Sequence, residues 1–124
     1  MTQTDDHLKL PIGDGLSESF VPDFGVIQQK IHHNAVYHGF WNDDPDPARF
    51  IALMHSELSE ALEALRKGNP ASEKIAGSHL AEELADCIIR IMDFAGGMDL
   101  DVGQAIVDKH NYNIGRSHKH GKEF

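Results

Sequence analysis

The chain has 124 residues and a formal net charge of −9, from 20 Asp and Glu against 11 Lys and Arg. This length predicts one domain with a modest core. The acidic balance argues against duplex nucleic acid or an anionic membrane as a partner, because both attract basic surfaces. No membrane-spanning run, no signal peptide and a single cysteine, Cys87, together predict a cytoplasmic protein without internal disulfides.

The first half of the chain predicts an arm followed by two helices. Residues 1–20 are polar and lack a sustained hydrophobic period, so we expect a flexible N-terminal arm. A first helix is expected over residues 22–38. A second is expected over residues 47–67, because Asp46 can cap it, Pro47 suits its first position and Gly68 follows its end.

Two more helices are expected after a loop over residues 68–77. Ser78 can cap a helix that runs to about residue 95, and Asp101 can cap a last helix that ends near Gly115. The expected core stripes are Phe24, Ile27, Ile31 and Ala35; Ile51, Met54, Leu58, Ala61, Leu62 and Leu65; and Leu80, Leu84, Ile88, Ile91 and Ala95. No convincing strand pattern occurs, so the fold class is all-α, a four-helix bundle or close relative. The helical domain spans residues 21–116, and residues 117–124 form a basic C-terminal tail.

Paired acids on the second and third helices are the strongest chemical signal. Glu57 and Glu60 are three positions apart, as are Glu83 and Asp86, so each pair shares a helix face. If the two helices pack antiparallel, the four carboxylates converge and repel one another. Such a site suits Mg²⁺, which binds through oxygen and commonly carries substrate phosphates. Solvated helix faces are the simpler interpretation of the same acids.

Other metal sites fit the sequence less well. The nine histidines include no His-x-x-x-His pair within a helix, and zinc would lack a cysteine partner apart from Cys87. A di-iron bundle needs Glu-x-x-His on two helices, and no such motif occurs. A non-enzymatic acidic helical interaction protein remains an alternative to the Mg²⁺ site.

The motif Glu57-x-x-Glu60, 22 intervening residues and Glu83-x-x-Asp86 resemble the signature of the MazG-like all-α nucleoside triphosphate pyrophosphohydrolases. The resemblance extends from about residue 24 to residue 124. It also includes the segments Ile31–Ala35, Gly39–Trp41, Ile51–Ala61 and Glu82–Asp86, with Lys109, Asn113, Arg116 and His120–Lys122. The same superfamily holds the dimeric dUTPases and the phosphoribosyl-ATP pyrophosphohydrolases, which are the closest alternatives.

The resemblance implies a reaction and a set of site residues. Glu57, Glu60, Glu83 and Asp86 would bind Mg²⁺, or Mn²⁺ in its place, and take part in catalysis. The implied reaction converts a nucleoside triphosphate and water to the monophosphate and pyrophosphate. Lys109, Asn113 and Arg116 would contact the substrate. The resemblance further implies a bundle completed by self-association as a dimer or tetramer.

Five more residues complete the prediction. Trp41 and Phe40, at a turn, could offer a stacking surface for a base, and Asn34 lies on a flank of the first helix from which it could reach a nucleotide. Arg90 shares the flank of Glu83 and Asp86 and is expected to orient carboxylates as an ion-pair partner. Asp93 is expected to be a solvated acid or an extension of the acidic site.

Overall fold

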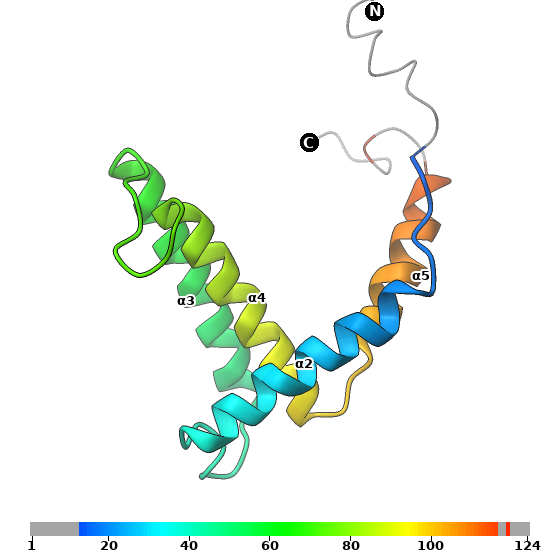
Figure 1. Ribbon diagram of the computed structural model, residues 1–124, viewed down its shortest axis with the longest axis horizontal. Coiled ribbons are helices and arrows are strands. Elements are labelled where there is room, and N and C mark those ends of the chain that lie inside the picture. Colours follow the sequence, from blue (N-terminus) through cyan, green and yellow to red (C-terminus); the bar gives the residue numbers. More distant parts are fainter. Residues whose placement is uncertain (1–12, 117–118, 120–124) are drawn as a thin grey trace, which may run out of the picture. The chain divides into compact units, whose positions relative to one another are not determined.

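The computed structural model describes residues 13–116 and 119. Its described part contains four helices, α2 (Phe20–Tyr37), α3 (Pro47–Arg66), α4 (His79–Gly97) and α5 (Val102–Ile114), and no strand beyond an isolated bridge between Ala71 and Ser78 (Figure 1). The all-α prediction is therefore confirmed. None of the described helices combines the length and apolarity that a membrane crossing needs. Most of the predicted arm and tail, residues 1–12, 117–118 and 120–124, lies outside the described residues.

Three of the helix starts follow the predicted capping chemistry. The side chain of Asp46 accepts from the amide of Ala48, and that of Ser78 accepts from Ala81. Asp101 accepts from the amide of Gln104 in the same way. Each cap satisfies one of the amides that a helix start leaves without an intrahelical partner.

The chain divides into two compact units, one comprising residues 26–100 and the other residues 1–25 and 101–124. In the second of these, Val107 is almost completely buried, and Phe24 packs against Gly103. The segment before α2 is fastened to α5, because the amide of Leu16 donates to Asn111 Oδ1 at 2.8 Å. His110 Nε2 adds a hydrogen bond to the carbonyl of Asp14 at 2.9 Å.

The unit of residues 26–100 is built on a hairpin in which α3 and α4 pack side by side (Figure 1). Small side chains line the seam between the two helices: Ala61, Ala64 and Cys87 are all buried. Small residues allow two helix axes to approach closely. The connecting loop is held by backbone hydrogen bonds from Ser72 to Gly77 (2.9 Å) and from His79 to Pro70 (2.7 Å). This loop fixes where α4 begins relative to the end of α3.

The predicted core stripes of the hairpin are wrong for six residues. Their exposed fractions lie between 43% and 58%. We call them the outer apolar face: Ile51, Leu58, Leu62, Leu65, Leu84 and Ile88. The physical reason is a rotation of about 100° on each helix, because the seam uses the preceding positions 50, 57, 61 and 64 on α3 and 83 and 87 on α4. In an antiparallel pair, this rotation brings both stripes to the same side of the hairpin.

Candidate metal centre and adjoining pocket

The hairpin brings the predicted acids together from two helices. Carboxylate oxygens of Glu57 and Glu60 on α3 and of Glu83 on α4 all lie within 4.8 Å of one another. Glu57 and Glu83 are 7% and 6% exposed, whereas Glu60 faces solvent. Asp86 stands one turn after Glu83 and is not among the oxygens within this distance, so the structure brings together three of the four predicted acids. The acidic cluster is defined here as Glu57, Glu60, Glu83 and Asp86.

The surroundings of two carboxylates in the cluster raise their pKa values. A hydrogen bond with Glu57, followed by burial and by the charge of Glu83, raises the pKa of Glu60 above its ordinary value. Burial is the main cause that raises the pKa of Asp86, and the charge of Glu57 adds to it. Both shifts have the direction expected for carboxylates that lack sufficient positive charge nearby.

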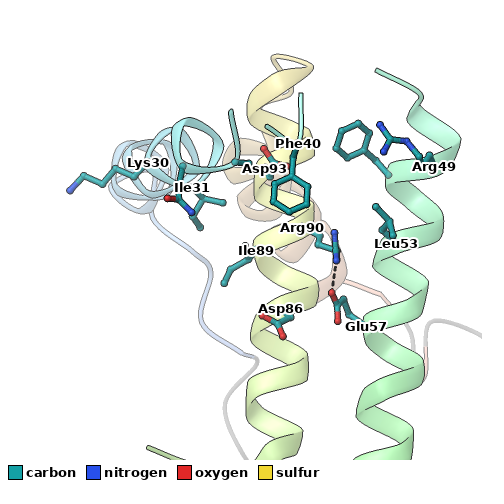
Figure 2. Close-up of a pocket in the computed structure, with 13 residues that line it drawn as sticks. Lys30, Ile31, Phe40, Arg49, Leu53, Glu57, Asp86, Ile89, Arg90 and Asp93 are labelled. Atoms are coloured by element: carbon teal, nitrogen blue, oxygen red, sulfur yellow. Dashed lines mark hydrogen bonds and ion pairs between the residues drawn. The ribbon is translucent and has the colours of Figure 1, made fainter. Parts of the chain in front are cut away.

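The side chains of Arg90 and His79 contact the cluster. Arg90 Nε on α4 donates to Glu57 Oε2 on α3, as the dashed line in Figure 2 marks. His79 Nε2 lies 2.9 Å from Glu83 Oε2. Within the described residues, Glu60 and Asp86 form no ion pair. Arg90 therefore joins the two helices at the cluster, which agrees with its predicted role as a partner that orients carboxylates.

The donor set matches a hard divalent cation. All four groups offer carboxylate oxygens, which Mg²⁺ and Mn²⁺ prefer over the nitrogen and sulfur ligands typical of zinc. A cation bound there would also offset the repulsion between the carboxylates, which contributes to the two raised pKa values after hydrogen bonding and burial. The residues present therefore fit the metal that the sequence predicted.

A pocket of about 410 Å³ adjoins the acidic cluster and includes Glu57 and Asp86 in its wall (Figure 2). In Figure 2, α4 lies between α2, which carries Lys30 and Ile31, and α3, which carries Arg49 and Leu53. The apolar part of the wall consists of Ile31, Ala35, Phe40, Phe50, Leu53 and Ile89. Three cations and three acids complete it: Lys30, Arg49, Arg90, Glu57, Asp86 and Asp93. An apolar pocket of this volume with a few charged groups is typical of small-molecule sites.

The two predicted base contacts have different surroundings. Asn34 lines the pocket. Trp41 instead stacks on Phe50 with ring centroids 4.5 Å apart, and its Nε1 donates to Asp93 Oδ1 at 2.8 Å. Its neighbour Phe40 does line the pocket and is 58% exposed. The aromatic ring available to a ligand is therefore that of Phe40.

The predicted phosphate contacts belong to the unit of residues 1–25 and 101–124. Lys109 Nζ lies 4.8 Å from the centre of the Tyr112 ring, and Arg116 Cζ lies 5.6 Å from the same ring. The Oδ1 atom of Asn113 is buried and accepts no hydrogen bond within the described part of the chain. A substrate contact for Lys109, Asn113 and Arg116 stays a prediction.

Several features of the pocket were not foreseen. Asp93, expected to be solvated or part of the acidic site, is 8% exposed and bonds to Trp41 and His32. Arg49 and His32 had not been assigned a role. The available signal was the pair Gly96-Gly97, which forms the last two residues of α4. Consecutive glycines inside a helix indicate a close approach by another segment.

Comparison of the chain with protein-family models, curated proteins and solved structures finds no match.

Proposed function

We propose that the chain is a Mg²⁺-dependent nucleoside triphosphate pyrophosphohydrolase, which cleaves its substrate between the α- and β-phosphates. The observation that carries this proposal is the convergence of Glu57, Glu60 and Glu83 from two helices, with oxygens within 4.8 Å, at the edge of a pocket large enough for a nucleoside. The resemblance of the two acidic motifs to the MazG-like enzymes supports the same reaction.

Each part of the cluster has a distinct role in this mechanism. Glu57, Glu60, Glu83 and Asp86 would hold Mg²⁺, which when bound supplies positive charge for the phosphates and acidifies water. Glu60 is the solvent-facing carboxylate, so it is our choice to accept the proton of the attacking water. The water oxygen forms a bond to the α-phosphorus while the bond to the pyrophosphate oxygen breaks. Arg90 keeps Glu57 in place across the seam.

The remaining substrate contacts are part of the proposal. Lys109, Asn113 and Arg116 would bind the phosphates, and Asn34 would reach the nucleoside. Of the two aromatic residues predicted to stack on a base, Phe40 would take that role, because Phe40 lines the pocket and Trp41 stacks on Phe50.

We further propose that two copies of the chain pair through the outer apolar face, which completes the helical bundle. The face presents six aliphatic side chains on one side of a hairpin. Contiguous apolar surface of this kind is typical of protein interfaces. A dimer or tetramer would bury it.

The test is pyrophosphate release from a panel of canonical and modified nucleoside triphosphates with Mg²⁺. Glu60→Gln and Asp86→Asn should each lower the rate by about 100-fold or more, because transition-state charge stabilisation of this kind has that magnitude. Glu63→Gln is the matched control, since Glu63 is an exposed acid of α3 whose partner is Lys67 at 3.8 Å. It should retain the wild-type rate.

A metal titration separates the enzyme from a non-enzymatic acidic helical protein. Mg²⁺ at 100 times its dissociation constant should stabilise a real site by about 2.7 kcal/mol, which a thermal melt detects. An adaptor with solvated carboxylates would show no such rise in Tm. Wild-type protein that releases no pyrophosphate from any substrate would contradict the proposed function.

A further inference from the structure

Asp93 is a buried carboxylate at the wall of the pocket that the proposed reaction does not use. It is 8% exposed, and its Oδ1 accepts from Trp41 Nε1 at 2.8 Å and from His32 Nδ1 at 2.9 Å. An ionised carboxylate only accepts hydrogen bonds, so the Nδ1 atom of His32 carries the proton in this contact. Among the described residues Asp93 has no other partner. Its second oxygen, Oδ2, is left to accept from a molecule in the pocket.

The chain holds this carboxylate in place through unusually close packing. A Cβ atom at Gly97 would meet the ring of Trp41 at 2.2 Å, and one at Gly96 would meet Cβ of His32 at 2.9 Å. Two glycines inside α4 therefore let both hydrogen-bond donors approach Asp93. The rings of His32 and Trp41 also pack edge to face, with centroids 4.9 Å apart. Asp93 is thus fixed by its neighbours before any ligand binds, as a recognition group requires.

The pocket around Asp93 suits a flat heteroaromatic group. Phe40 offers an exposed ring and Ile31, Leu53 and Ile89 offer aliphatic surface. Because the pocket shares Glu57 and Asp86 with the acidic cluster, a base placed there would be joined to phosphates at the proposed metal centre. An apolar wall with one fixed acceptor selects ligands by their hydrogen-bond donors.

We propose that the pocket binds the nucleobase and that Asp93 accepts a hydrogen bond from an exocyclic amino group of that base. This inference rests on the proposed function and names its substrate class: nucleotides of amino-bearing bases, namely cytosine, adenine and guanine types. Uracil is disfavoured because its ring N–H lies between two carbonyl oxygens, which repel a carboxylate. A base without the amino group would leave Oδ2 of Asp93 desolvated and without a hydrogen bond from the ligand.

The inference is tested by binding of nucleoside monophosphates, which are not hydrolysed. Two matched pairs are compared: GMP against IMP, which differ by one amino group, and CMP against UMP, in which a carbonyl oxygen replaces the amino group and the ring nitrogen N3 gains a proton. Isothermal titration calorimetry of the wild-type chain with Mg²⁺ should show at least tenfold tighter binding of the amino-bearing member in one pair or both. Binding within twofold in both pairs overturns the inference.

Asp93→Asn provides the second arm. The side-chain carbonyl of asparagine can still accept from Trp41 Nε1. In that orientation the side-chain NH₂ of asparagine faces the pocket as a donor, so the preference for CMP over UMP should vanish or reverse. Asp99→Asn is the matched control, because Asp99 is exposed, lies outside the pocket and has a φ of 58°, which asparagine tolerates. The control should keep the wild-type ratio.

The ratio separates recognition from a merely structural role. If Asp93 only holds Trp41 and His32 together, Asp93→Asn weakens both members of a pair equally and the ratio is unchanged, which overturns the inference. Wild-type protein that releases pyrophosphate but shows no base preference would overturn this inference and leave the proposed function intact. Absence of pyrophosphate release removes the proposed function and this inference with it.

Discussion

A helical hairpin at a protein surface usually buries its apolar residues and exposes its acids. The α3–α4 hairpin does the opposite on two of its faces. Toward the seam and the pocket it buries acids, with Glu57, Glu83 and Asp93 all below 9% exposed. On the outer apolar face it exposes six aliphatic residues by 43% to 58%. Burial of an unpaired charge costs free energy, and exposure of contiguous leucines promotes association. Neither arrangement stabilises a monomer.

The difference teaches that the two faces are stabilised in different ways. On the acidic face each buried acid has a hydrogen-bond partner: Arg90 for Glu57, His79 for Glu83, and Trp41 with His32 for Asp93. Such an arrangement is typical of a site built for a ligand. The outer apolar face consists of aliphatic side chains, and its proposed partner is a second copy of the chain.

The largest expected effect comes from charging the outer face. Leu58→Glu combined with Leu62→Glu should weaken self-association by at least 100-fold, equivalent to about 2.7 kcal/mol, because two carboxylates per chain would be buried in an apolar interface. Sedimentation velocity over a concentration series measures the change. Ser59→Glu adds one charge to the exposed surface of α3 outside the stripe and should leave association unchanged. If the wild-type chain sediments as a monomer both at its highest soluble concentration and after 100-fold dilution, it does not self-associate through the outer apolar face.

A smaller effect is expected from the packing beneath the acidic face. Gly97→Ala places a Cβ 2.2 Å from the Trp41 ring, so the ring must move and its hydrogen bond to Asp93 must lengthen. We expect a loss of about 1–3 kcal/mol in the free energy of unfolding, as overpacking usually costs. Urea unfolding followed by the fluorescence of Trp41, the single tryptophan of the chain, measures it.

Gly25→Ala is the matched control for this substitution. Gly25 also lies inside a helix, α2, but a Cβ there would meet nothing within 4 Å. Alanine should therefore stabilise the protein by about 0.5–1 kcal/mol. Equal effects of both substitutions would show that the approach of Trp41 to α4 is unimportant.

The smallest effect concerns pH and sharpens the account of the acidic face. The pKa values of Glu60 and Asp86 are raised above 4.5 and 3.8, so the folded chain binds more protons than the unfolded one as pH rises past these values. Without metal, the free energy of unfolding should fall as pH rises through the raised pKa values. Urea unfolding in a chelator, measured upward from pH 4, follows this decline.

The double variant Glu60→Gln, Asp86→Asn isolates the two groups from all other titrations. Its free energy of unfolding should decline less with pH than that of the wild type, and it should be the more stable protein at neutral pH in the chelator. Mg²⁺ should stabilise the wild type and not the double variant. An identical pH slope in the two proteins would contradict the account of repulsion in the cluster.

The sequence predicted the helices and the convergence of Glu57, Glu60 and Glu83, because both depend on local signals. Asp46, Ser78 and Asp101 cap their helices through contacts two or three residues away. Glu57 and Glu60 share a face through helical geometry alone. A short connection between the helices then required only that α3 and α4 pack antiparallel for Glu83 to join them.

The remaining features depend on tertiary packing that periodicity does not encode. The apolar stripes of α3 and α4 were assigned to the core, whereas the seam uses Ala61, Ala64 and Cys87. Hydrophobicity identifies leucine as the better core residue, but a close seam selects for small volume instead. Asp93 was equally hard to place, because its burial depends on His32 and Trp41, which approach it only across Gly96 and Gly97.

The position of Cys87 allows local opening of the hairpin to be measured by thiol labelling. Its thiol is buried in the seam, with Sγ 3.6 Å from the carbonyl of Met54, and it is the single cysteine of the chain. A thiol reagent can reach it only when α3 and α4 separate locally. The rate of labelling, followed by mass spectrometry, therefore reports how often the helices that carry the acids part from each other. Mg²⁺ bound across both helices should slow that labelling.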